Sequence, residues 1–67
     1  MNNEELIQKA IEAGFDGTQC SRVTARDGYE AVRLPRNIEA LTNLEEAVPT
    51  LKSVDREFTF HSWLVRA

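Results

Sequence analysis

Apolar side chains recur with the period of an α-helix near the start of the chain. Their spacing is i, i+1, i+4 and i+5, which places them in one stripe along a helix. The residues of this stripe are Leu6, Ile7, Ala10 and Ile11. Asn2 precedes the stripe and suits an N-cap, whereas Gly14 follows it and suits a left-handed C-terminal stop. The pattern therefore predicts a first helix that ends before Gly14.

A second helical period lies between Pro35 and Pro49. Asn37 can cap this helix, and Pro49 ends it because the proline ring disfavours helical geometry at the preceding residue. The apolar positions with helical spacing are Ile38, Leu41, Leu44 and Val48.

Residues 18–35 are rich in Thr, Val, Tyr and Arg and contain Asp27-Gly28, a strong signal for a β-hairpin. A two-residue turn at Asp27-Gly28 would set Arg22 opposite Arg33 and collect the apolar side chains on one face. A three-residue loop, residues 26–28, would mix apolar and charged residues on each face. We favour the two-residue turn because it separates polar from apolar side chains more cleanly, although it opposes two arginines.

The last segment, residues 57–66, is rich in aromatic and β-branched residues and predicts a third strand with two apolar faces. Its alternating sets are Phe58, Phe60, Ser62 and Leu64 on one face and Thr59, His61, Trp63 and Val65 on the other. Residues 50–55 are expected to form a connector between the second helix and this strand.

We therefore expect one small α+β domain that spans residues 1–67. Its order is helix, strand, strand, helix, strand, with a three-stranded, mainly antiparallel sheet and both helices packed on one face. The second face of the sheet would be open.

The size and composition of the chain agree with such a domain. With 67 residues the core is small, so most large apolar side chains must be buried, and a hydrophobic fraction of 42% excludes a disordered chain. The net charge is −3, but the charges form blocks. Residues 1–16 carry four acidic side chains and one lysine, residues 17–36 four arginines and two acidic side chains, and residues 37–57 five acidic and two basic side chains. Two acidic blocks thus flank a basic hairpin.

The sequence offers little for catalysis or metal binding. A single cysteine, Cys20, excludes an internal disulfide, and no Cys and His cluster exists from which to build a zinc site. Cys20 and His61 could act as nucleophile and base, but no motif supplies a third orienting group, so we interpret both as structural residues. We expect no enzyme, no cofactor and no metal. The acidic N-terminus and the lack of a long apolar run lead us to expect a soluble cytoplasmic protein that does not bind membranes.

The candidate binding surface is the open face of the sheet. In the favoured register this face gathers basic and aromatic side chains, which are over-represented where partners dock. These residues are Arg22, Arg26, Tyr29, Arg33, His61 and Trp63. Two alternatives stand beside this interpretation. Trp63 could lie in the core, through a bulge at Ser62-Trp63 or because helices cover both faces, and the arginines could form no more than a solvated surface.

From these observations we expect a small non-enzymatic module that binds another protein through the basic and aromatic face. A regulator or inhibitor of the kind that phages and mobile elements encode is consistent with the size and acidity. One alternative is a module for single-stranded nucleic acid, with Tyr29, His61 and Trp63 as stacking surfaces, although such modules are normally basic. Another alternative is a subunit of a homodimer. The sequence does not identify the partner.

Overall fold

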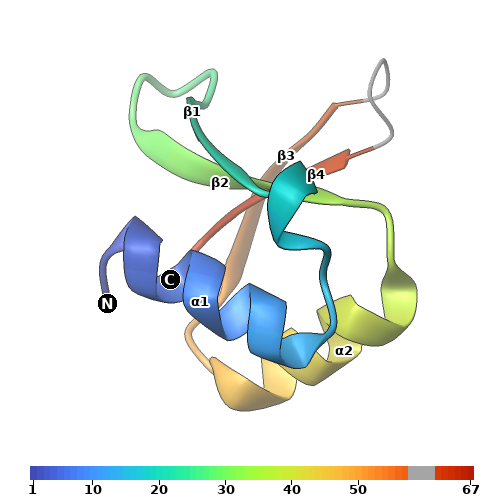
Figure 1. The fold of residues 1–67 in the computed structure, drawn as a ribbon. Helices are drawn as coiled ribbons and strands as arrows, with labels where there is room; N and C mark the ends of the chain where they lie inside the picture. Colours follow the sequence, from blue (N-terminus) through green and yellow to red (C-terminus); the bar gives the residue numbers. More distant parts are fainter. Residues whose placement is uncertain (58–61) are drawn as a thin grey trace.

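Two helices lie on one face of an antiparallel sheet in the computed structural model, which describes residues 1–57 and 62–67 (Figure 1). Within this part of the chain the elements are α1 (Asn3–Ala13), the 3₁₀ turn η1 (Gly17–Gln19), β1 (Ser21–Thr24), β2 (Glu30–Pro35), α2 (Ile38–Ala47), β3 (Lys52–Glu57) and β4 (Ser62–Arg66). The strand order is β1-β2-β4-β3, and every neighbouring pair is antiparallel. The broad α+β class is confirmed.

Both helices begin and end where the sequence places their caps. The Asn2 side chain accepts a hydrogen bond from the Glu5 N–H at 2.8 Å, and Gly14 ends α1 in the left-handed region at φ 118°. Asn37 caps α2 in the same way by accepting from the Ala40 N–H at 3.1 Å. Local sequence signals are therefore sufficient to define the helical layer.

The sheet has four strands in the described part of the chain, so the prediction of three is wrong. Of the expected connector, residues 50–55, the last four belong to β3, and the described part of the expected last strand, residues 57–66, includes Glu57 at the end of β3 and all of β4. β3 is an edge strand with mostly charged residues and a bulge between Ser53 and Asp55. It lacks the apolar alternation that marks a strand in a sequence, because four of its six residues are charged, as is common for a strand at the edge of a sheet. The predicted strand positions of Phe58, Thr59, Phe60 and His61 lie outside the described residues.

The β1–β2 hairpin has the three-residue loop, so the two-residue turn that the sequence favours is wrong. The Ala25 N–H donates to the Tyr29 carbonyl oxygen at 2.9 Å, and the Gly28 N–H donates to the Ala25 carbonyl oxygen at 3.0 Å. Gly28 adopts φ 86°, the left-handed conformation that ends a three-residue loop of this kind. This hydrogen-bond pattern fixes the register of the two strands.

The register decides which side chains share a face. Arg22 lies opposite Val32, and Arg33 lies opposite Ser21, so the two arginines stand on opposite faces of the sheet and the expected like-charge pair does not form. The sequence argument assumed one apolar and one polar face. It failed because both faces of this sheet hold apolar side chains.

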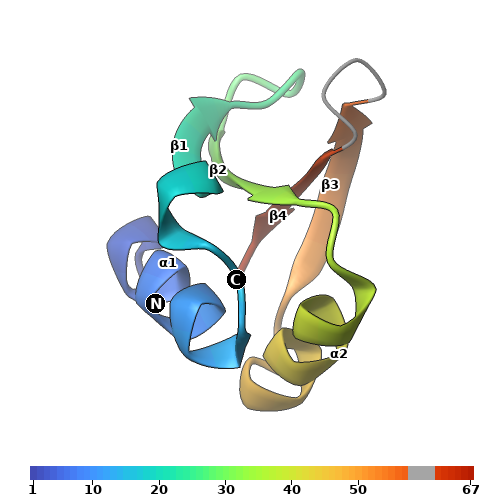
Figure 2. The ribbon, with the colours of Figure 1, turned by 45° about the vertical axis from the view of Figure 1, so that its right-hand side comes forward.

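The main core lies between the helices and the sheet. Its buried members are Leu6, Ala10, Phe15, Val32, Leu34, Ala40, Leu44, Val48 and Val65. A second, smaller cluster lies on the face that the helices leave uncovered. It consists of Ala25, Ala31 and Leu64, with Val23 and Val54 packed against it. The β1–β2 hairpin and the paired strands β3 and β4 extend away from the helices (Figure 2). We call the face with the smaller cluster the open face.

The β1–β2 turn is clamped by the C-terminal strand. The Arg66 guanidinium donates two hydrogen bonds to the Asp27 carboxylate, Nη1 to Oδ2 at 2.8 Å and Nη2 to Oδ1 at 3.0 Å. The Tyr29 N–H also donates to Asp27 Oδ1 at 3.0 Å, and the Arg66 guanidinium carbon lies 5.9 Å from the centre of the Tyr29 ring. These contacts connect residues 39 positions apart in the chain and fix the end of the hairpin.

The clamp shifts the pKa values of both charged partners. The pKa of Asp27 is lowered, first by the Arg66 hydrogen bonds and then by the Tyr29 N–H, because these donors stabilise the carboxylate. The pKa of Arg66 is raised, mainly by the hydrogen bonds to Asp27. Both groups are therefore charged in the folded protein at neutral pH.

Leu44→Ala is expected to lower the free energy of unfolding by about 2–5 kcal/mol, since Leu44 is fully buried in the main core and the truncation leaves a cavity. Ile38→Ala on the same helix is the matched control, because Ile38 is 65% exposed, and is expected to change it by less than about 0.5 kcal/mol. Urea unfolding followed by the fluorescence of the single tryptophan measures both. An equal loss in free energy of unfolding for Leu44→Ala and Ile38→Ala would contradict the assignment of Leu44 to the core.

Asp27→Asn is expected to destabilise the fold at pH 7 because it removes the charge that Arg66 binds. Since the folded-state pKa of Asp27 is lowered, its carboxylate contributes stability above the ordinary value of 3.8, and this contribution is lost as the pH falls through the folded-state pKa. The difference in unfolding midpoint between the wild type and Asp27→Asn should therefore shrink below about pH 4. In the double variant Asp27→Asn with Arg66→Gln, the loss in free energy of unfolding should be smaller than the sum of the losses in the two single variants. A pH-independent difference or full additivity would argue against the clamp.

Candidate functional site

The structure places three of the six predicted binding residues on or beside the open face. Tyr29 and Arg33 point to the open face, since they share it with Ala25 and Ala31 through the pairing of β1 and β2. Arg26 lies in the exposed loop between the strands. We call Arg26, Tyr29 and Arg33, together with Arg66, the hairpin surface.

Arg22 and Trp63 belong to the other face, so their predicted place on the open face is wrong. Arg22 points toward α1, where its Nη1 lies 3.6 Å from Glu4 Oε1. Trp63 lies opposite Leu34 and packs, half-buried, against the main core. The prediction for His61 lies outside the described residues.

Trp63 reaches the core without the bulge that the sequence suggested as one route. β4 pairs with β2 without interruption from Ser62, opposite Pro35, to Val65, opposite Val32. The set that contains Trp63 and Val65 faces the helices, and the set that contains Ser62 and Leu64 faces the open side. Alternation shows which residues share a face. It cannot show which face the helices cover when both sets are apolar.

Arg66 is a member of the site that sequence reasoning missed. Its place in β4 follows from the alternation with Leu64, but its partner Asp27 lies in another hairpin, and no local pattern signals their contact. Through this contact the position of Tyr29 is fixed although its side chain is 70% exposed. An exposed aromatic ring held in this way loses little conformational entropy when a partner covers it.

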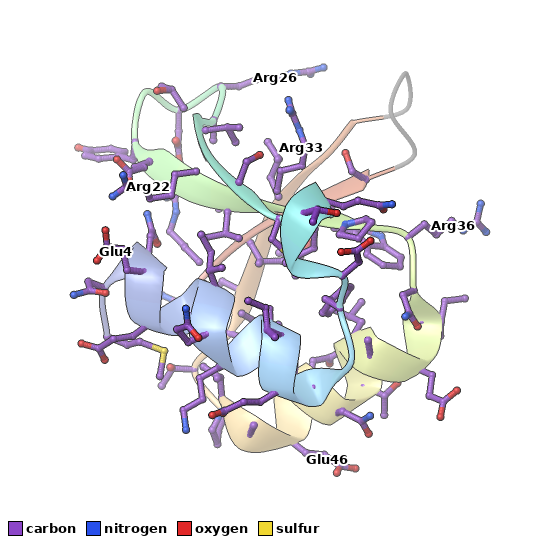
Figure 3. The ribbon with its side chains drawn as sticks, viewed as in Figure 1. Glu4, Arg22, Arg26, Arg33, Arg36 and Glu46 are labelled. Carbon is purple, nitrogen blue, oxygen red and sulfur yellow. The ribbon has the colours of Figure 1, made fainter. Side chains whose placement is uncertain are left out.

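Charge is unevenly distributed between the helices and the β1–β2 hairpin. The two helices carry six glutamates and one lysine, a net charge of −5. The hairpin region, residues 17–36, carries a net charge of +2. Figure 3 shows Arg26 and Arg33 at the end of the molecule that the β1–β2 loop forms, with Arg36 beside α2 and Glu46 at the far helical side. This arrangement would orient a charged partner before contact.

Cys20 lies at the edge of the main core. Its Sγ lies 3.4 Å from the Asp16 carbonyl oxygen. Burial, and then the nearby charge of Asp16, raise the pKa of the Cys20 thiol, so it is protonated at neutral pH and weakly nucleophilic.

Two features are absent from the residues that the structure describes, a cluster of metal-binding side chains and a helix able to span a membrane. No group of three or more His, Cys, Asp or Glu side chains among residues 1–57 and 62–67 is arranged to hold a metal ion. In the same part of the chain, neither helix has the length and apolar character that a membrane crossing requires.

Comparisons with protein-family models, with curated proteins and with solved structures find no match to this chain. The arrangement of the hairpin surface is therefore the basis for any functional conclusion.

Proposed function

We propose that this chain is a small, non-enzymatic protein-binding module that docks an acidic surface of another protein through the hairpin surface. The main support is the placement of Tyr29. Its ring is 70% exposed, lies beside the Arg66 guanidinium and stands on a loop that Asp27 holds in place. Tyr and Arg are the residue types that contribute most to binding energy at protein interfaces.

The distribution of charge supports a protein partner with acidic groups. The strongly acidic helices would repel such a partner, so it would approach the basic hairpin end of the molecule. The small size of the chain suits a regulator or inhibitor, which acts by covering a surface of its target.

The alternative of single-stranded nucleic acid receives less support. That function needs a platform of aromatic rings on the open face, and Trp63 faces the helices instead. Of the three rings considered for stacking, Tyr29 stands at the hairpin end and His61 lies outside the described residues. The net charge of −3 also opposes binding to phosphates.

Arg26→Glu is expected to weaken binding of the partner by about tenfold or more, because it places a carboxylate against an acidic surface. Lys9→Glu on α1 is the matched control, since both variants change the net charge from −3 to −5, and it should retain the affinity within about threefold. The tagged chain is used to purify a stoichiometric protein from cells of the source organism, and that protein is then titrated with each variant.

Three outcomes would contradict the proposal. Equal loss of affinity in the two variants would indicate an effect of net charge alone. Recovery of no stoichiometric protein would argue against a protein partner. Tight binding to a single-stranded oligonucleotide that weakens between about 50 and 200 mM salt would favour the nucleic-acid alternative.

A further inference from the structure

Strand β1 is an open edge of the sheet. It pairs with β2 on one side, and no described element pairs with it on the other. The Ala25 N–H donates to the Tyr29 carbonyl oxygen, so Ala25 and Tyr29 form a hydrogen-bonded pair. Hydrogen-bonded and non-hydrogen-bonded pairs alternate along an antiparallel ladder, so the next hydrogen-bonded pair is Val23 with Ala31. The backbone N–H and C=O groups of Arg22 and Thr24 therefore point away from the sheet. They form a short row of two donors and two acceptors.

The two edges of the sheet differ in their protection against strand pairing. β3 carries four charged residues in six and a bulge between Ser53 and Asp55, which are features that discourage a further strand. β1, with the sequence Ser-Arg-Val-Thr, has one charged residue, no proline and a regular register with β2. Of these two edges, β1 is the one suited to accept another strand.

The charges around β1 indicate what kind of strand would fit. Arg22 is within the strand, and Arg26 follows it in the loop. Arg33 lies opposite its first residue and Glu30 opposite its last, so three arginines stand against one carboxylate. The ion pair of Arg22 with Glu4 is long, at 3.6 Å, and its two side chains are 53% and 76% exposed, so an incoming carboxylate could replace Glu4 at little cost. An added strand would thus lie in a basic environment.

We propose that β1 binds an extended acidic segment of a partner protein as an additional strand of the sheet. This inference rests on the proposed function and adds the mode by which the partner binds. Backbone hydrogen bonds to Arg22 and Thr24 would hold the segment, and acidic side chains in it would meet the arginines that flank the edge. A second copy of this chain fits less well, because pairing β1 with itself would bring together the arginines of two hairpins.

The test uses the wild-type chain and a seven-residue peptide of alternating Thr and Glu, with Lys in place of Glu as the control peptide. In the free chain the amide hydrogens of Arg22 and Thr24 should exchange rapidly with solvent, whereas that of Val23 should be protected. Saturation with the acidic peptide should slow exchange at Arg22 and Thr24. The Lys peptide should leave both amides unchanged.

Thr24→Pro removes one outward donor without removing a hydrogen bond between β1 and β2, so it should weaken peptide binding by about three- to tenfold. Thr24→Val is the matched control, since it keeps the N–H and the branched shape, and should bind as the wild type does. The emission spectrum of Trp63 reports whether each variant is folded. If Thr24→Pro does not fold, the exchange measurement on the wild type decides alone.

The possible results separate this inference from the proposed function. Loss of the purified partner with Arg26→Glu, but not with Thr24→Pro, would leave the proposed function standing and overturn strand addition. Peptide binding without slower exchange at Arg22 and Thr24, or no binding of the acidic peptide, would overturn it as well. Sedimentation that shows a dimer broken by Thr24→Pro would identify a second copy as the occupant and refute the acidic segment.

Discussion

The fold depends on strand β2, which is paired on both edges and buried on both faces. Val32 and Leu34 point toward the helices, and Ala31 points toward the open face, and all three are fully buried. A strand in this environment does not tolerate a shift in register, because a shift by one residue would move the side chains of each buried cluster to the opposite face of the sheet. The registers of β1 and β4 are both set against it. The position of every side chain in the hairpin surface follows from this constraint.

The smaller cluster on the open face explains why such a short chain adopts one register. A domain of 67 residues has a small core, and burial of Ala25, Ala31 and Leu64 adds apolar surface that a single covered face would not provide. The structure therefore places small apolar groups on the open face, where the sequence suggested basic and aromatic side chains.

The clamp between Asp27 and Arg66 connects stability with the proposed function. Its two hydrogen bonds join the loop of one hairpin to the last strand, and they hold the exposed Tyr29 ring beside a guanidinium. A binding surface that is already ordered in the unbound protein pays a smaller entropic cost on association. The same clamp fixes the end of β1, so that the open edge beside it is presented in one geometry. The helices, with their opposite charge, remain on the other side of the molecule (Figure 3).

The comparison of prediction and structure shows which signals were strong. Helix boundaries were predicted well because caps and prolines act within a few residues, as Asn2, Gly14 and Asn37 illustrate. The extra strand β3 was missed because an edge strand with charged side chains has no apolar alternation. The hairpin register was wrong because both turns are compatible with Asp27-Gly28, and the choice between them rested on a polar open face that does not exist.

The sequence by itself determined the two helices, the position of the hairpin, the α+β class and the separation of charge along the chain, since each of these follows from residues that are neighbours in sequence. Only the tertiary structure decided which face of each strand meets the helices. It turned Trp63 and Arg22 toward the helical layer, and it joined Arg66 to Asp27 across 39 positions. Those outcomes depend on packing between distant segments. Alternation restricts a side chain to one of two faces, but the burial of the whole sheet selects between them.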